Sequence, residues 1–238
     1  MCGRMQSKNP PTWAEIHAYY SAFTIKKSHP DWRPGDMNPG DPVPIVALRD
    51  GERRVTTARW WLVPSFATEL KSHYKMFNAR ADNLIEQYRW WQALPPSLRS
   101  HKGSAYLAPF KEGRRCLMPV NGYYEFKNGK PYLFTLTDQW IFSVAGLWEW
   151  APKVRTPDWP KGVISCTMIT TEPNAIAAPI HDRMPVIIRP EDYDVWLDPK
   201  RDMEEVIALM RPYDGDNFAV RAVAPPMSRY DTLQPSMF

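Results

Sequence analysis

Proline is the residue that most restricts what this chain can fold into. The sequence holds 25 prolines among 238 residues, about twice the usual proportion. A proline breaks the interior of a helix and removes a hydrogen-bond donor from a central strand. We therefore expect short strands, many loops and few long helices. The hydrophobic fraction of 44% and the charged fraction of 24% are those of an ordinary globular protein, which excludes a disordered chain, a collagen-like repeat and a coiled coil.

Turn residues and apolar periodicity divide the chain into many short elements. Asp50-Gly51 and Asn128-Gly129 are dipeptides typical of tight hairpin turns. The apolar spacing predicts helices over residues 12–23, 83–94, 190–197 and 202–210, and strands over residues 44–48, 55–63, 117–127, 131–136, 141–150, 163–171, 184–188 and 220–223. This pattern predicts an α+β domain, with a bent, barrel-like, mainly antiparallel sheet and short flanking helices. Because the sequence has no internal repeat and no linker, residues 1–238 are expected to form a single domain.

The charge balance permits a nucleic-acid partner without requiring one. Lys and Arg number 30 against 26 Asp and Glu, which gives a net charge of +4. No apolar run approaches the length of about 18 residues that a transmembrane helix needs. The residues before Arg4 contain no apolar stretch of the kind that a secretory signal has. We therefore expect no contact with a membrane. A monomer is also expected.

Cysteine usage indicates a reducing, cytoplasmic compartment. The three cysteines, Cys2, Cys116 and Cys166, are an odd number without a CxxC spacing. This argues against a disulfide framework and against a structural zinc site, so no metal or cofactor is predicted. Cys116 and Cys166 lie in apolar stretches and are expected to be inert core residues.

Cys2 is different because it follows the initiator methionine. Removal of Met1 would leave an N-terminal cysteine, whose α-amine has a reference pKa of about 7.7–8.0 and whose thiol has one of about 8.5. The thiolate could attack an acyl carbon with the amine as base. Alternatively, the amine and thiol together could condense with an aldehyde, first to an imine and then to a thiazolidine ring. The residue alone does not decide between these chemistries, or against a cysteine placed there by chance.

Three further positions could contribute chemistry. Asn78 and Arg80 occupy a predicted strand end and should point the same way. Glu125 lies between aromatic residues, either facing solvent or in an apolar pocket where its pKa would rise and it could act as acid and base near neutral pH. His181 lies in a charged loop before a strand, and a lone histidine in such a place is more often structural than catalytic.

The chain resembles the SRAP family (SOS response-associated peptidase), whose members crosslink to abasic sites in single-stranded DNA. The blocks that carry the resemblance span most of the chain in family order, and their combination is specific. They are Met1-Cys2-Gly3-Arg4, Trp60-Trp61-Leu62-Val63-Pro64-Ser65, Asn78-Ala79-Arg80-Ala81, Arg114-Arg115-Cys116-Leu117-Met118-Pro119, Gly122-Tyr123-Tyr124-Glu125-Phe126, Ala145-Gly146-Leu147-Trp148-Glu149, Thr170-Thr171-Glu172 and His181-Asp182-Arg183-Met184-Pro185.

This resemblance implies a single SRAP-type domain and a role for each candidate residue. The mature Cys2 would form the covalent bond, its amine giving an imine with the ring-opened sugar and its thiol closing the thiazolidine. Asn78 would position the amine, Glu125 would shuttle the proton during ring opening and loss of water, and His181 would be a second acid or base. The protein would act in the SOS response to DNA damage as a covalent, lyase-like sensor that protects the lesion, with a possible cysteine-peptidase activity.

The resemblance also implies a single-stranded DNA partner containing abasic sites, and a nucleoid-associated location in a bacterium. The expected DNA contacts are Arg4, Asn38, Trp60, Trp61, Pro64 and Arg80. The arginines would clamp phosphates, and the aromatic residues with the loop after Pro64 would stack on bases or wedge the strand. Strand alternation puts Trp60 and Trp61 on opposite sides, so one of them is expected in the core.

The chain departs from the family pattern in four places. The loop Met37-Asn38-Pro39-Gly40 is shorter than the family's Asn-x-x-Pro-Gly. Trp61 stands where the family has glycine, and Phe66 stands where tryptophan is usual. The stretch 86–104 is longer than the family norm, and a helix on the rim of the site is expected there.

Other functions use the same residues. An N-terminal-nucleophile hydrolase, similar to class II glutamine amidotransferases, would use Cys2 on an amide, since Met-Cys-Gly also opens those enzymes. A non-covalent single-strand-binding module would use only tryptophan and arginine. A peptidase acting on its own N-terminus is also compatible with Cys2 chemistry.

Overall fold

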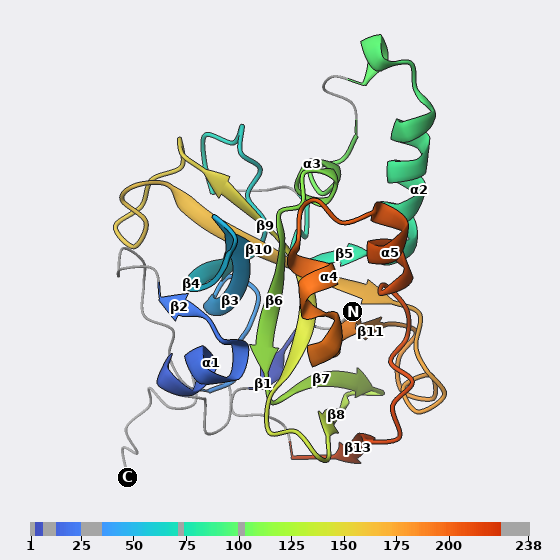
Figure 1. Ribbon diagram of the computed structural model, residues 1–238. Helices are drawn as coiled ribbons and strands as arrows, with labels where there is room; N and C mark the ends of the chain where they lie inside the picture. Colours follow the sequence, from blue (N-terminus) through green and yellow to red (C-terminus); the bar gives the residue numbers. More distant parts are fainter. Residues whose placement is uncertain (1–2, 7–12, 25–34, 71–73, 100–102, 225–238) are drawn as a thin grey trace.

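Five strands close into a barrel, shown in the computed structural model of Figure 1, which describes residues 3–6, 13–24, 35–70, 74–99 and 103–224. The barrel strands are β3 (Pro42–Arg49), β4 (Glu52–Trp60), β6 (Arg115–Val120), β9 (Phe142–Ala151) and β10 (Val163–Thr171). They follow the order β4-β3-β6-β9-β10, and β10 pairs back onto β4. This closing pair is parallel and the other four are antiparallel. The predicted barrel-like, mainly antiparallel α+β fold is confirmed.

Short strands extend the barrel at its ends. These strands are β2 (Phe23–Thr24) on β4, β5 (Asn78–Arg80) and β11 (Met184–Pro185) on β10, and β12 (Ile187–Ile188) on β9. β5 and β11 contact the same stretch of β10, because Thr170 is registered with Arg80 on one side and with Pro185 on the other. Two segments distant in the sequence are therefore held against the end of one strand.

A second sheet of four antiparallel strands lies beside the barrel (Figure 1). In spatial order its strands are β1 (Met5–Gln6), β7 (Gly122–Lys127), β8 (Lys130–Leu136) and β13 (Phe218–Ala222). The β7–β8 hairpin turns at Asn128 and Gly129, which both have positive φ angles (49° and 76°) as a tight turn requires. β1 forms the edge of this sheet, and Met5 pairs with Tyr123.

The helices are short, as expected. They are α1 (Trp13–Tyr20), α2 (Ala81–Ala93), α3 (Leu107–Lys111), α4 (Tyr193–Leu197) and α5 (Met203–Ala208), with 3₁₀ turns η1 (Pro96–Leu98) and η2 (Pro190–Asp192). α2 rises away from the barrel in Figure 1. Arg99 closes its end by donating to the carbonyls of Leu94 (2.9 Å) and Gln92 (2.8 Å). The ring of Trp91 lies 5.2 Å from the Arg99 guanidinium carbon and 4.9 Å from Lys111 Nζ, so cation–π contacts hold the following segment to α2.

Several predicted boundaries were wrong for local reasons. The strand predicted over 117–127 is two strands in different sheets, broken where the Asn121 amide donates to the carbonyl of Gln6 (3.0 Å). A Cβ at Gly122 would lie 2.7 Å from the carbonyl oxygen of Phe134, so this crossing needs glycine. The first helix ends at Tyr20 rather than at residue 23, because Ser21 takes a positive φ of 47°.

A further difference concerns the strand predicted over 184–188, which is two separate two-residue strands on β10 and β9.

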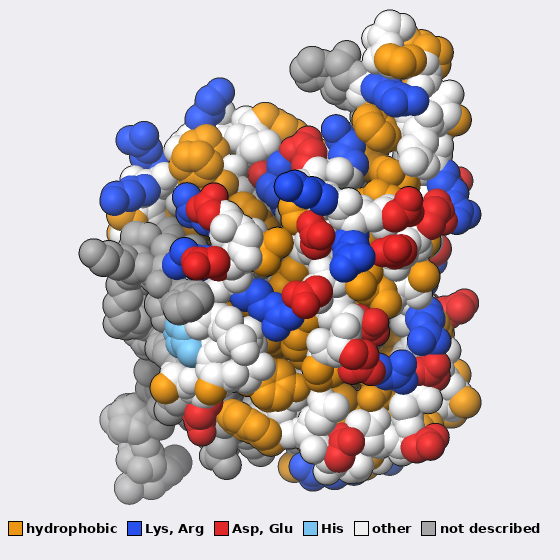
Figure 2. Space-filling view, viewed as in Figure 1, with side chains coloured by type: hydrophobic (Ala, Val, Ile, Leu, Met, Phe, Trp, Pro, Cys, Tyr) orange, Lys and Arg blue, Asp and Glu red, His pale blue; other side chains and the backbone are white. Residues whose placement is uncertain are grey.

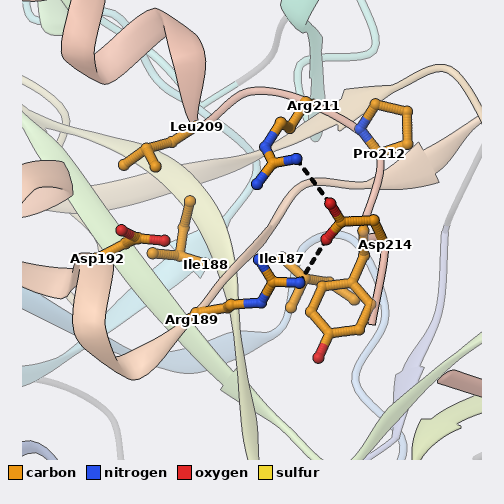
Figure 3. Close-up of a pocket in the computed structure, with 9 residues that line it drawn as sticks. Ile187, Ile188, Arg189, Asp192, Leu209, Arg211, Pro212 and Asp214 are labelled. Carbon is orange, nitrogen blue, oxygen red and sulfur yellow. Dashed lines mark hydrogen bonds and ion pairs between the residues drawn. The ribbon is translucent and has the colours of Figure 1, made fainter. Parts of the chain in front are cut away.

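Buried and surface arginines anchor the outer elements. Arg115 is only 1% exposed and donates to the carbonyls of Trp196 (2.5 Å) and Asp198 (2.6 Å), which fixes α4 and the turn after it to β6. Figure 3 shows a smaller anchor, in which Arg189 and Arg211 both bond the carboxylate of Asp214.

The described helices include none that is long and apolar enough to cross a bilayer.

Candidate functional site

Glu125 lies on β7, next to the N-terminal strand β1. The neighbouring Tyr124 amide donates to the carbonyl of Arg4 at 3.0 Å. Glu125 is only 3% exposed. Burial, with a further contribution from the charge of Asp182, raises the pKa of the Glu125 carboxyl to about 8. Of the two environments that the sequence left open, the structure has the buried one, so the carboxyl carries a proton at neutral pH and can donate it.

His181 reaches Glu125 from the loop before β11. Its Nε2 lies 3.6 Å from Glu125 Oε2, and its Nδ1 accepts the backbone N–H of Arg183 at 3.0 Å. Burial lowers the pKa of His181, so the ring is neutral at pH 7. A neutral imidazole whose Nδ1 accepts a hydrogen bond carries its proton on Nε2, the atom that faces Glu125. Asp182 Oδ1, also 3.0 Å from Nδ1, can accept from that nitrogen only when Nδ1 itself carries a proton.

Asn78 and Arg80 lie on β5, which pairs in parallel with β10. Both line a cleft of about 740 Å³ between the loop after β4 and helix α2. Asn78 is buried (9% exposed), whereas the Arg80 side chain is half exposed (52%) and forms an ion pair with Asp82. The cleft has apolar and aromatic walls, and its lining includes Pro64, Phe66 and Tyr74.

Two aromatic side chains at this cleft are unusually exposed. Phe66 and Tyr74 are 75% and 78% exposed. Large apolar side chains with so little packing are available to stack on a ligand. Tyr74 was not singled out from the sequence, since a tyrosine in a polar loop carries no signal of which cavity it borders.

Arg4 and Asn38 come together near the edge of the second sheet. Arg4 Nε donates to Asn38 Oδ1 at 3.0 Å. The Asn38 amide in turn donates to Asp41 Oδ2 at 2.9 Å, which fixes the loop before β3. Two of the predicted DNA-contacting residues are thus neighbours, although they lie 34 positions apart in the sequence.

The expectation that Trp60 contacts DNA was wrong. Trp60 is fully buried, and its indole N–H donates to the carbonyl of Phe77 at 2.9 Å, because this face of β4 points into the barrel. Trp61 is half-buried on the other side, with its ring 5.4 Å from that of Phe77 and the Arg59 guanidinium 5.9 Å from its centroid. Only Trp61 of this pair has surface to offer a ligand.

The three cysteines fall into two groups. Cys2 lies outside the described residues. Cys116 and Cys166 are buried, and burial raises the pKa of both thiols, which keeps them protonated and unreactive. Among the described residues, no three metal-binding side chains gather into a cluster.

The carboxylate of Asp82, which was not singled out from the sequence, connects Arg80 with Arg183. Asp82 accepts from Arg80 Nη2 at 2.8 Å and from Arg183 Nη2 at 2.9 Å. Its position two residues after Arg80 was visible, but the contact with Arg183 spans 101 residues and needed the fold. Figure 2 shows acidic and basic side chains interspersed over one face of the molecule. No broad field of one sign covers that face.

The raised pKa of Glu125 predicts that folding stability falls as the pH rises. The unfolded carboxyl loses its proton near 4.5 and the folded one near 8. Between these values the folded state binds more protons, so the stabilisation is full below pH 4.5 and is lost by about pH 8. The free energy of unfolding should be measured in urea at pH 5 and at pH 8.5. Between these two pH values, wild type should lose on the order of 4 kcal/mol more of this free energy than Glu125→Gln does. Parallel pH curves for the two proteins would contradict the buried, protonated state.

Proteins of known name have sequences similar to this chain. The model of the SOS response associated peptidase (SRAP) family matches residues 1–229. Abasic site processing protein YoqW of Bacillus subtilis is 32% identical over 236 residues, which cover 94% of this chain and 92% of that protein. Abasic site processing protein HMCES of Xenopus tropicalis is 26% identical over 241 residues, which cover 83% of this chain and 66% of that protein.

Solved structures show the same fold. A crystal structure of a protein from Bordetella bronchiseptica has a TM-score of 0.71 at 20% identity, over 94% of this chain and all of that one. Another, from Bacteroides thetaiotaomicron, has a TM-score of 0.69 at 24% identity, over 94% of this chain and 93% of that one. The family match over nearly the whole length, together with 32% identity to YoqW, establishes that this chain belongs to the SOS response associated peptidase family.

Proposed function

We propose that this protein processes abasic sites in single-stranded DNA by forming a covalent thiazolidine through Cys2. The observation that carries the proposal is the buried Glu125 carboxyl, with a pKa of about 8, facing His181 Nε2 at 3.6 Å. The names of the family relatives, which are abasic site processing proteins, supply the substrate.

The position of Arg4 supports a part for Cys2 in the chemistry of this pair. Arg4 is bonded through its carbonyl to Tyr124, the residue next to Glu125. Cys2 precedes Arg4 by two residues, and two residues span at most about 7 Å. The amine and thiol of a mature N-terminal Cys2 can therefore meet a substrate that also contacts Glu125.

The proposed reaction condenses the aminothiol with the ring-opened sugar. The Cys2 amine adds to the aldehyde carbon, and the hydroxyl formed there leaves as water with a proton from Glu125. The thiol sulfur then adds to the imine carbon, and its proton passes to the imine nitrogen, which closes the ring. One water is released in total. The proton that the amine nitrogen loses as the imine forms returns to the Glu125 carboxylate, His181 Nε2–H donates a hydrogen bond to that carboxylate while it is ionised, and Asn78 orients the amine.

The cleft offers a path for the strand on either side of the lesion. Arg80 contacts a phosphate at its rim, and the exposed rings of Phe66 and Tyr74 stack on bases beside Pro64. The remaining contacts in this proposal are from Arg4, Asn38 and Trp61. Such contacts read the backbone and the faces of bases, so binding is tolerant of sequence.

A covalent adduct is the direct test. Mature protein is mixed with single-stranded DNA that carries one abasic site and is run on a denaturing gel. We expect a retained adduct for wild type and for the matched control Cys116→Ala, and none for Cys2→Ala. Free protein in every lane would exclude the proposal. Hydrolysis of glutamine or of a peptide, without an adduct, would favour the alternative in which Cys2 attacks an amide.

Glu125→Gln should slow adduct formation without weakening DNA binding. The amide has no proton of comparable acidity to give to the departing hydroxyl, and a positioned general acid typically contributes about 10²–10⁴ in rate. Single-turnover crosslinking at saturating DNA measures this, while fluorescence anisotropy reports binding. An unchanged rate would remove Glu125 from the mechanism.

Arg80→Ala should weaken DNA binding and reduce its salt dependence. Loss of one phosphate contact lowers the slope of log K against log salt by about 0.7 for a single strand. Arg211→Ala is the matched control, because Arg211 is similarly exposed (56% against 52%) and paired with an aspartate on the part of the surface in Figure 3. Equal slopes for Arg80→Ala and Arg211→Ala would mean that Arg80 does not touch phosphate.

A further inference from the structure

The carboxylate of Asp82 is shared by two arginines from distant segments. Arg80, on β5, donates to it through Nη2 (2.8 Å) and Nε (3.4 Å). Arg183, in the loop before β11, donates to it through Nη2 (2.9 Å). Asp82 lies in the first turn of α2, where the helix dipole also favours a negative charge.

The Arg183 side of this network is buried and tightly placed. Arg183 is 9% exposed, and its Nη2 also donates to the carbonyl of Thr170 at 2.7 Å. Thr170 is the β10 residue registered with both β5 and β11. The guanidinium of Arg183 therefore lies across the end of β10, where it forms an ion pair with the carboxylate of Asp82. The bond from Arg80 holds the pKa of Asp82 down to about 2, so this carboxylate is ionised throughout the neutral range.

Arg183 also determines which nitrogen of His181 carries the proton. The backbone N–H of Arg183 donates to His181 Nδ1 at 3.0 Å. That bond favours a proton of the neutral ring on Nε2, facing Glu125, over one on Nδ1, for which Asp182 Oδ1 at 3.0 Å is the competing acceptor. Anchoring the Arg183 side chain on Asp82 and Thr170 fixes the position of this backbone N–H, and so the orientation of the ring.

On the other side, Asp82 fixes the guanidinium of Arg80. The bonds to Asp82 use the Nε and Nη2 edge, which directs the Nη1 atom away from the carboxylate. The side chain is 52% exposed at the rim of the cleft. A guanidinium held in place before binding loses less conformational entropy when it takes a phosphate.

We propose that Asp82 is a positioning residue for this site, orienting Arg80 toward a DNA phosphate and, through Arg183, orienting His181 toward Glu125. This inference rests on the proposed function. It adds to the residues that contact DNA a residue, Asp82, that holds them in position. A purely structural Asp82, which only stabilises α2 and neutralises Arg183, would affect stability but would not act selectively through Arg80 and His181.

Double variants separate these two roles. Asp82→Asn removes the charge and keeps the shape, and Glu86→Gln, an exposed change one turn further along α2, is the matched control. Binding is measured with single-stranded DNA carrying a tetrahydrofuran in place of the lesion, which has no aldehyde. Crosslinking is measured in single turnover at saturating abasic DNA. We expect Asp82→Asn to lose about tenfold in affinity and about tenfold in rate, since a side chain that is no longer held in place must be ordered when the DNA binds or reacts.

The loss should depend on the partner. In an Arg80→Ala background, Asp82→Asn should cost no further affinity, and in a His181→Ala background it should cost no further rate. Asp82→Glu, which retains the charge, should lie between wild type and Asp82→Asn, whereas Glu86→Gln should stay within twofold of wild type. Losses of equal size in every background would overturn the inference in favour of a structural role.

A measurement independent of DNA covers the remaining outcomes. Nitrogen-15 NMR of the histidine rings should show His181 protonated on Nε2 in wild type and a mixture of tautomers in Asp82→Asn. An unchanged tautomer would overturn the inference. If Asp82→Asn does not fold, Asp82→Glu takes its place in the same double variants, and wild-type values for it in affinity, rate and tautomer would overturn the inference. Absence of an adduct with wild type would count against the proposed function alone, because the NMR comparison still tests Asp82.

Discussion

The backbone pairing of β1 with β7 decides which side chains lie near Arg4, Met5 and Gln6. β1 is only two residues long, but its neighbourhood is held by the bond between Arg4 and Tyr124 and by mutual bonds between Met5 and Met37. This pairing aligns the first residues with the strand that carries Glu125. The barrel contributes the other residues of the candidate site, since its strand β10 pairs with β5 and with β11, and the loop before β11 carries His181.

Two kinds of electrostatic environment lie within a short distance of each other. Glu125 and His181 are both kept in their neutral forms by burial, which suits groups that exchange protons near pH 7. Asp82 is held as an anion by its two arginines. The neutral pair is suited to proton transfer and the charged network to holding geometry, and Arg183 connects them through one backbone bond to His181.

Much of the fold was predictable from local signals. The Asn128-Gly129 turn and the closed, mainly antiparallel sheet follow from turn chemistry and strand spacing. The start of α5 follows from capping, since the Glu204 N–H donates to the side chain of Asp202 at 2.7 Å. The break at Asn121 was not predictable, because it depends on a bond to Gln6 far away in the sequence.

The site was predictable only in part, for a related reason. Residue types and the family resemblance singled out Glu125 and His181, and the structure brings them together. Trp60 was misjudged, since alternation shows that two adjacent tryptophans differ in direction but not which one faces the barrel interior. The partners of Asp82 come from β5 and from the loop before β11, and only the fold shows that these meet.

The tight placement of β1 also limits what can be attached ahead of it. Any leader, fusion partner or affinity tag added before Met1 would end within three residues of Arg4, whose carbonyl is bonded beside Glu125. In the proposed reaction, such an extension would compete for space with the incoming DNA and would leave Cys2 without a free amine. The proposed function therefore requires recombinant protein without added N-terminal residues. A cleavable export signal would have to be removed directly before Cys2.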